Sequence, residues 1–253
     1  MINSYDHFVL LAESLQWDET TLDFGPDQAA WPRLGDAERT RVLGLIAGFC
    51  IAESAVSEHI EPFEGAATNE WMAACFRAQA RDEHRHARFF DRVAAEVAAV
   101  PGAGPAARLD VLRTLVGAEL VALFEERLPA TARSLAEDGD GLIAAVGLYH
   151  MVLEGVVLLA GQNALLDALD RLSAPLPGVR RGAELVLRDE RWHMGFGTRL
   201  VQAAHLRASE VQALLALGQA AAGAWGDLVS PGAAERAVRI HQRRLRAVDM
   251  KFW

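Results

Sequence analysis

Cysteine is scarce in this sequence of 253 residues, which contains only Cys50 and Cys75 and no pair spaced as CxxC. A thiolate zinc site and a disulfide scaffold are therefore not expected. Basic residues are also in the minority, with 25 Lys and Arg against 34 Asp and Glu and a formal net charge of −9. Because nucleic-acid binders usually present a basic face, this balance argues against a nucleic-acid partner.

Signals for secretion and for membrane insertion are missing as well. The N-terminal residues contain no basic stretch followed by an apolar run, so no secretory signal is predicted. The longest apolar stretch, residues 142–169, is interrupted by five polar residues, His150, Glu154, Gln162, Asn163 and Asp167. Membrane spans rarely tolerate so many polar side chains. The sequence thus predicts a cytoplasmic protein with no membrane partner.

Alternating runs of Val, Ile and Thr are absent, whereas Ala, Leu, Arg and Glu dominate, which is helix composition. Segments rich in Gly, Pro, Ser and Asp divide the chain. Between them the sequence predicts helices over residues 36–60, 70–99, 107–136, 141–171, 179–205, 208–225 and 233–246.

Long helices joined by short connections favour an antiparallel bundle. No shift in composition marks a boundary, so we expect a single all-α domain over residues 1–253. Residues 1–35 contain Pro26 and Pro32 and are expected to form an irregular strap with one short helix. The core bundle is expected over about 36–205, with further C-terminal helices over 206–253.

Two Glu-x-x-His motifs carry the chemistry, Glu83 with His86 and Glu190 with His193. Residues three apart lie on one helix face with Cβ atoms about 5–6 Å apart, so each pair can bind one metal ion. Two-metal carboxylate bundles combine two such helices with one Glu from each of two others.

Two further glutamates meet that requirement. Glu53 and Glu154 lie within apolar helical runs, where a free carboxylate would be costly to bury. The predicted ligands are therefore Glu53, Glu83, His86, Glu154, Glu190 and His193. Four carboxylates would balance two divalent ions in the core. Oxygen and imidazole ligands suit iron or manganese, and ligand type alone also allows zinc.

An aspartate precedes each motif, Asp82 and Asp189. We expect each to accept a hydrogen bond from a ligand imidazole, with an exposed helix-surface aspartate as the alternative. Among other candidates, Glu119 lies in an apolar run and is a reserve ligand. His84 is out of phase with His86 and is expected to be solvated, and His150 is expected to be a packed core histidine.

These motifs resemble those of the ferritin-like dinuclear-metal proteins of the ribonucleotide reductase small-subunit type. The resemblance covers residues 36–205 and rests on AES with Glu53, DEHRH at 82–86, YHMVLEG at 149–155 and RDERWHMGFG at 188–197. It implies a ferritin-like four-helix bundle with additional helices. It also implies two metal ions per chain, Fe/Fe or Mn/Fe.

Tyrosine usage separates the branches of this superfamily. The radical-bearing reductase subunit has a Tyr four residues after the first ligand His, where this chain has Phe90. Phe is also found there in reductases with a manganese–iron site, but such subunits need a tyrosine in the C-terminal tail, and this chain has only Tyr5 and Tyr149. A reductase role is therefore disfavoured. Val186 replaces the extra ligand histidine of the arylamine oxygenases.

Tyr149 and Val56 resemble the Tyr and Val of the reductase-like ligand-binding oxidases. That group activates O2 at an Fe/Fe or Mn/Fe site, can form a Tyr–Val ether cross-link, and holds a long-chain fatty acid. The alternative for Tyr149 is a core tyrosine with one hydrogen bond. Four apolar residues beside the predicted ligands are candidates for the wall of a pocket, and they could equally belong to the ordinary core. They are Val56, Phe90, Val157 and Phe196.

The resemblance implies an O2-activating oxidase or oxygenase that acts on a small apolar or amphipathic organic substrate. An external electron donor, a fatty-acid-like ligand and a homodimer would accompany this activity. Two alternatives stay open, a radical-generating reductase-like small subunit and a non-catalytic metal-binding protein.

Overall fold

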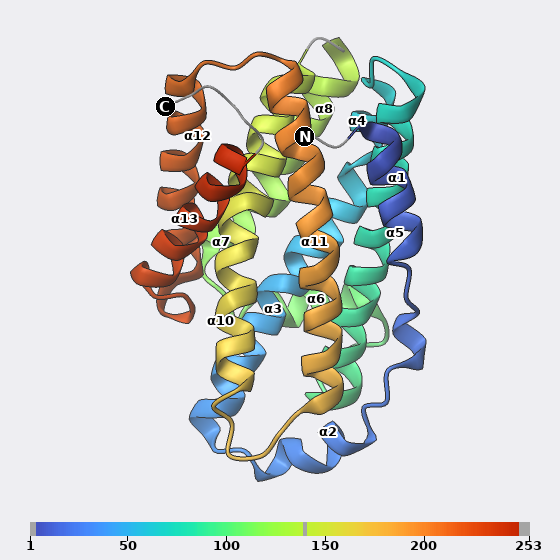
Figure 1. Cartoon of the computed structure of the whole chain (residues 1–253). Helices are drawn as coiled ribbons and strands as arrows, with labels where there is room; N and C mark the ends of the chain where they lie inside the picture. Colours follow the sequence, from blue (N-terminus) through green and yellow to red (C-terminus); the bar gives the residue numbers. More distant parts are fainter. Residues whose placement is uncertain (1–3, 139–140, 248–253) are drawn as a thin grey trace.

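A computed structural model describes residues 4–138 and 141–247, and every regular element in these ranges is helical. Four long elements form the central bundle (Figure 1). They are α3 (Asp36–His59), α5 (Glu70–Arg92), the continuous run of α9 (Leu142–Val146), η5 (Gly147–Leu158) and α10 (Leu159–Leu169), and α11 (Pro177–Ala203). This arrangement confirms the predicted all-α bundle.

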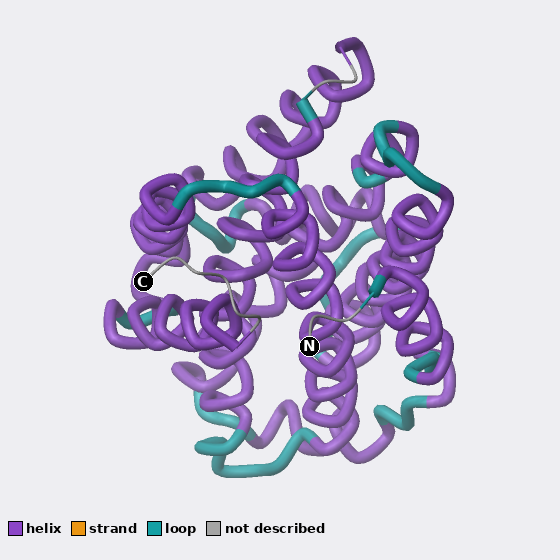
Figure 2. Tube along the Cα trace, turned by 45° about the horizontal axis from the view of Figure 1, so that its top comes forward, coloured by secondary structure: helices purple, strands orange, loops and turns teal. Residues whose placement is uncertain are grey.

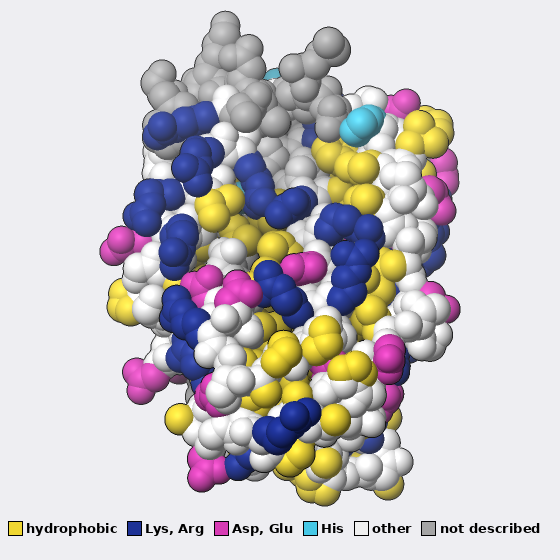
Figure 3. Space-filling view, turned by 60° about the horizontal axis from the view of Figure 1, so that its bottom comes forward, with side chains coloured by type: hydrophobic (Ala, Val, Ile, Leu, Met, Phe, Trp, Pro, Cys, Tyr) yellow, Lys and Arg dark blue, Asp and Glu magenta, His cyan; other side chains and the backbone are white. Residues whose placement is uncertain are grey.

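Two of these elements are long and apolar enough to span a membrane, Asp36–Gly65 and Leu142–Leu169. In the most apolar window of each, 72% and 83% of the residues are buried inside the bundle, respectively. The two helices are thus core helices whose apolar faces are covered by protein. Charged side chains are spread between apolar ones over the face shown in Figure 3.

The N-terminal strap contains more helix than the sequence predicted. It forms α1 (Tyr5–Ser14), η1 (Glu19–Thr21), α2 (Gly25–Ala30) and η2 (Trp31–Arg33). Helix α1 packs against α5 and α11, and α2 packs against α11. The strap therefore crosses one face of the bundle and its lower end in Figure 1.

The helix expected over 107–136 is divided, which corrects the prediction. It forms α6 (Pro105–Arg113), α7 (Ala118–Ala122), η4 (Leu123–Arg127) and α8 (Leu128–Asp138). Gly117 caps α7 in an extended conformation (φ −68°, ψ 144°). Because glycine is a poor helix former, the chain can leave the helix at this point.

The remaining described elements are short or peripheral. Figure 2 shows the loops that join the helices of the molecule. They are α4 (Glu61–Gly65), η3 (Val93–Val97), α12 (Ala208–Ala221), η6 (Ala222–Leu228) and α13 (Pro231–Ala247). Both α12 and α13 pack against η5. The end of the predicted C-terminal region, residues 248–253, lies outside the described residues. A single domain over 1–253 stays a prediction.

Trp225 joins two helices of the bundle. A Cβ atom at Gly48 of α3 would lie 2.3 Å from its ring, and one at Gly161 of α10 would lie 2.4 Å from it. Its Nε1 donates a hydrogen bond to the Val157 carbonyl at 2.9 Å. The two glycines therefore make the space in which the indole packs.

Gly161→Ala is expected to destabilise the fold, because the added methyl group would overlap the Trp225 ring. Overpacking of this kind costs about 1–3 kcal/mol, measured as a drop in the free energy of unfolding in denaturant. Gly232→Ala is the matched control, since a Cβ atom there meets nothing within 4 Å. Equal stability of the two variants would contradict this account of the packing.

Candidate metal centre

All six predicted ligands lie together in the middle of the bundle. Each is at most 2% exposed. Helix α3 supplies Glu53, α5 supplies Glu83 and His86, η5 supplies Glu154, and α11 supplies Glu190 and His193. Their ligand atoms form two groups that could each hold a metal ion, Glu53–Glu83–His86–Glu190 and Glu83–Glu154–His193, with all atoms of a group within 4.8 Å of one another.

Two carboxylates lie between the two groups. The Nδ1 atom of His86 is 3.4 Å from Glu83 Oε2 and 3.5 Å from Glu190 Oε1. The Nδ1 atom of His193 is 3.2 Å from Glu83 Oε1 and 3.5 Å from Glu190 Oε2. Glu83 and Glu190 thus each offer one oxygen to each half of the site, as carboxylates that bridge two metal ions do.

The ligand atoms have few partners of their own. Seven of these atoms have no hydrogen-bond partner in the described part of the chain. They are Nδ1 of His86 and of His193, both oxygens of Glu53 and of Glu190, and Oε2 of Glu154. Buried polar atoms normally have partners, and orphans of this kind suggest an ion. The donor set, four carboxylates and two imidazoles without a thiolate, fits two iron or manganese ions.

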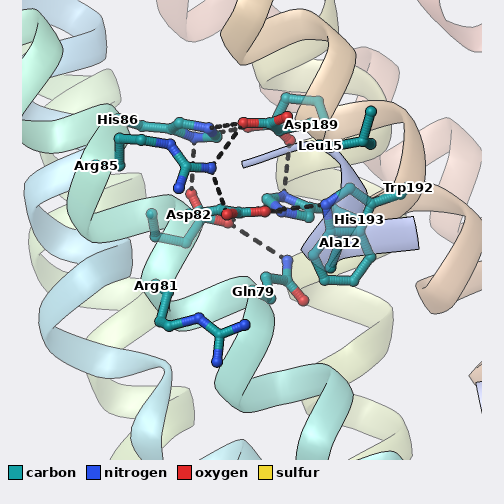
Figure 4. Close-up of polar contacts among 12 residues, drawn as sticks. Ala12, Leu15, Gln79, Arg81, Asp82, Arg85, His86, Asp189, Trp192 and His193 are labelled. Atoms are coloured by element: carbon teal, nitrogen blue, oxygen red, sulfur yellow. Dashed lines mark hydrogen bonds and ion pairs between the residues drawn. The ribbon is translucent and has the colours of Figure 1, made fainter. Parts of the chain in front are cut away.

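Each aspartate contacts the histidine of the opposite motif. His86 Nε2 donates to Asp189 Oδ2 at 3.3 Å, and His193 Nε2 donates to Asp82 Oδ2 at 3.4 Å. The Arg85 guanidinium lies between the two aspartates and pairs with both (Figure 4). Both carboxylates are buried, so the alternative of an exposed helix-surface aspartate does not apply. The bonds fix each ring with Nδ1 toward the site.

Two tryptophans complete this network, and the sequence pattern did not reveal either role. Trp17 of the strap donates its Nε1–H to Asp189 Oδ2 at 2.6 Å, and Trp192 of α11 donates to Asp82 Oδ2 at 3.0 Å. Gln16 also reaches Asp82, at 3.2 Å. The strap therefore takes part in orienting the ligand histidines.

Tyr149 is buried beside the ligands, in the π-helical element η5. Its hydroxyl donates a hydrogen bond to Glu83 Oε1 at 2.8 Å. Val56 is also buried and lies one helical turn beyond Glu53 in α3. Gln79 contacts both Tyr149 and the ligand Glu154. Its position one turn before Glu83 on the same helix is the signal that could have revealed it.

The structure separates the remaining candidates. Glu119 is exposed in α7, so the reserve ligand is excluded from the site. His84 is exposed, as expected, and its Nδ1 lies 2.7 Å from the Ala80 carbonyl. His150 is fully buried, as expected of a core histidine. Phe90 stacks on Phe49, with ring centroids 4.8 Å apart.

Burial changes the protonation of the ligands when no metal is bound. It raises the pKa of Glu154 from 4.5 to about 8 and raises the pKa of Glu53 as well. Burial alone would lower the pKa of His86 and His193, but the surrounding carboxylates outweigh it and raise both values. The two imidazoles conversely hold the pKa of Glu83 below its ordinary range, against the effect of burial.

The metal-free protein is therefore expected to lose stability as the pH rises from 6 to 9. Its raised pKa values mean that the folded state holds protons that the unfolded chain releases, and this advantage disappears as those protons leave. The free energy of unfolding in chelator should fall over this range. With bound Mn(II) the trend should reverse, since metal ligands must be deprotonated.

Glu154→Gln is the control for this titration, because it removes the group with a pKa of about 8. The decline between pH 7 and 9 should become shallower in this variant. A metal-free wild-type protein that gains stability over the same range would contradict the assignment.

No protein-family model matches the chain. Solved structures do match, among them several variants of R2-like ligand-binding oxidase. A valine-to-leucine variant with anaerobically reconstituted Mn/Fe cofactor is 18% identical, with a TM-score of 0.78. A glycine-to-phenylalanine variant prepared in the same way is 20% identical, with a TM-score of 0.81. A tyrosine-to-phenylalanine variant with aerobically reconstituted Mn/Fe cofactor is 17% identical, with a TM-score of 0.78.

Each of these matches covers 96% of this chain and 93% of the other. The similarity therefore includes the strap and the C-terminal helices as well as the bundle. At this level of identity it establishes the fold and not the activity. The protein has the all-α, ferritin-like fold of the R2-like ligand-binding oxidases, as the sequence resemblance implied.

Proposed function

We propose that the protein is an oxidase or oxygenase that binds two metal ions, Fe/Fe or Mn/Fe, and activates O2. The observation that carries the proposal is the convergence of six buried side chains, in which both histidine Nδ1 atoms and all oxygens of Glu53 and Glu190 lack partners among the described residues. The Mn/Fe cofactors of the structurally similar oxidases support the choice of metals. When bound, such an ion pair would supply the electrons and the oxidising power for O2 chemistry.

The protein side chains hold and orient this site. One metal ion would be held by Glu53 and His86 and the other by Glu154 and His193. Glu83 and Glu190 lie within reach of both halves and would contribute to both. Asp82 and Asp189 accept the Nε2–H groups of the histidines and so keep their Nδ1 atoms directed at the metals. The apolar walls of the bundle exclude water from the site.

The finer proposal concerns Tyr149 and Val56. In a Tyr–Val ether cross-link, the Tyr149 O–H and one Val56 C–H bond break and a C–O bond forms. Two electrons and two protons leave, and the hydrogen bond to Glu83 gives the phenolic proton an acceptor. Reduction of one O2 to water takes four electrons, and the two divalent metal ions would supply the other two. An external donor would be needed only to reduce the metals again.

The proposal extends to the substrate, the oligomeric state and the cellular location of the protein. Its substrate would be a small apolar or amphipathic organic molecule, or a fatty-acid-like ligand, as the resemblance to the ligand-binding oxidases implies. Val56, Phe90, Val157 and Phe196 are candidates for the wall that contacts it, and all are buried. We further propose a cytoplasmic homodimer.

The metal proposal predicts about two metal ions per chain after anaerobic loading with Fe(II) and Mn(II), measured by elemental analysis. Exposure of the loaded protein to air should then consume O2 at an oxygen electrode. Fewer than about one ion per chain would overturn the proposal, because the ligand set could then not act as a dinuclear site. Full loading without O2 uptake would favour a non-catalytic metal-binding protein, and co-purification with a larger chain would favour a reductase-like subunit.

The cross-link proposal predicts a mass loss of two hydrogens after air exposure, mapped to the peptides that contain Val56 and Tyr149. Tyr149→Phe should abolish the mass change and keep the metals. Tyr5→Phe is the control, because Tyr5 lies outside the site and packs beside Arg199. An unchanged mass in the loaded wild-type protein would exclude the cross-link and leave the metal site in place.

A further inference from the structure

Gln79 places a neutral amide among the ionisable groups of the site. It lies on α5, one helical turn before Glu83, and is fully buried. Its Nε2 atom is 2.6 Å from Glu154 Oε1, 3.0 Å from the Tyr149 hydroxyl and 3.4 Å from Glu83 Oε1. Three acceptors therefore compete for two N–H groups, and the shortest contact is to Glu154.

The carbonyl end of the same amide has its own partner. His150 Nε2 lies 3.1 Å from Gln79 Oε1. Burial lowers the pKa of His150 to about 3, so the ring is neutral and carries a single N–H. Because the amide oxygen can only accept, that N–H is on Nε2. If the amide turned over, its NH2 group would face the imidazole, which could accept at Nε2 only by moving its proton to Nδ1, where no partner lies among the described residues.

The packing around His150 leaves the ring little room to move. A Cβ atom at Gly197 of α11 would lie 2.3 Å from the His150 Cβ. The rings of Phe196 and Phe76 pack against the imidazole, with centroids 5.7 and 6.1 Å away. Its Nδ1 has no hydrogen-bond partner among the residues that the structure describes. Within the described part of the chain, the ring thus has one polar contact, and that contact holds the amide of Gln79.

The orientation of the amide determines how Glu154 and Tyr149 face the site. Oε1 of Glu154 accepts from Gln79 and is also 3.6 Å from Nδ1 of His193, so the amide holds this oxygen at the His193 half of the site. The amide also donates to the Tyr149 oxygen, so the hydroxyl must direct its own hydrogen elsewhere. That hydrogen goes to Glu83 Oε1, at 2.8 Å.

We propose that Gln79, locked in one amide orientation by His150, is a positioning residue of the metal centre. It holds Oε1 of Glu154 beside Nδ1 of His193 and directs the Tyr149 hydroxyl toward Glu83. The first part rests on the proposed metal binding, and the second part does not.

The first test is anaerobic titration of the full chain with Mn(II), in which the electron paramagnetic resonance signal of free Mn(II) reports binding. Gln79→Leu should weaken the binding of one Mn(II) at least about tenfold, as loss of a group that orients a ligand typically does, and leave the other within about twofold. Gln162→Leu is the matched control, because it removes a buried amide that has no partner among the described residues. Wild-type affinity at both sites in Gln79→Leu would overturn the proposal.

The second test addresses the lock. His150→Phe keeps Gln79 but removes the N–H that holds its carbonyl, and it should weaken the same Mn(II) site. His150→Gln can supply an N–H at that position and should recover most of the affinity. Equal loss in both variants would show that His150 acts only by packing and would overturn its assigned role.

The third test needs no metal. In a Tyr5→Phe background, Tyr149 is the single tyrosine of the chain, and its ultraviolet Raman doublet reports whether the hydroxyl donates or accepts hydrogen bonds. Gln79→Leu should shift the doublet toward a pure donor, and Gln162→Leu should not. An unchanged doublet overturns the proposal for Tyr149. A wild-type chain that binds no Mn(II) would instead refute the proposed function, and the Raman result would still stand.

Discussion

The structure depends on the burial of four glutamates and two histidines at the centre of an apolar bundle. Ionised groups in such a core are strongly unfavourable unless opposite charges and hydrogen bonds compensate them. Here the described protein atoms leave many of the oxygens and both Nδ1 atoms without partners. The six side chains nevertheless converge, because α3, α5, η5 and α11 each bring their polar residues to the same level of the bundle.

Contacts between different helices hold the ligands in place. Each ligand histidine is oriented by an aspartate of the opposite motif, and Arg85 joins the two aspartates. This network links α5 to α11, and Trp17 attaches the strap to it. On the other side of the site, His150 of η5 holds Gln79 of α5. A shift of one helix along its neighbour would break several of these bonds together.

The clustering of the candidate ligands could be predicted because its signal is local. Helix periodicity places Glu83 beside His86 and Glu190 beside His193, and the cost of burying a lone carboxylate singles out Glu53 and Glu154. The same reasoning wrongly kept Glu119 as a reserve ligand. That residue also has apolar neighbours in sequence, but it lies in a short helix on the exposed side of the bundle. Local composition could not tell which side faces the core.

The sequence by itself determined the helical fold and the candidate ligands with their order along the chain, since these follow from composition and spacing along single helices. Only the tertiary structure decided which partners those donors have. Trp17 meets Asp189 across 172 positions of the chain, and no periodicity encodes that contact. The π-helical geometry of η5 brings residues five apart onto one face, which places Tyr149 and Glu154 together around the amide of Gln79. Helix periodicity is a property of one segment, whereas these contacts depend on how segments are packed.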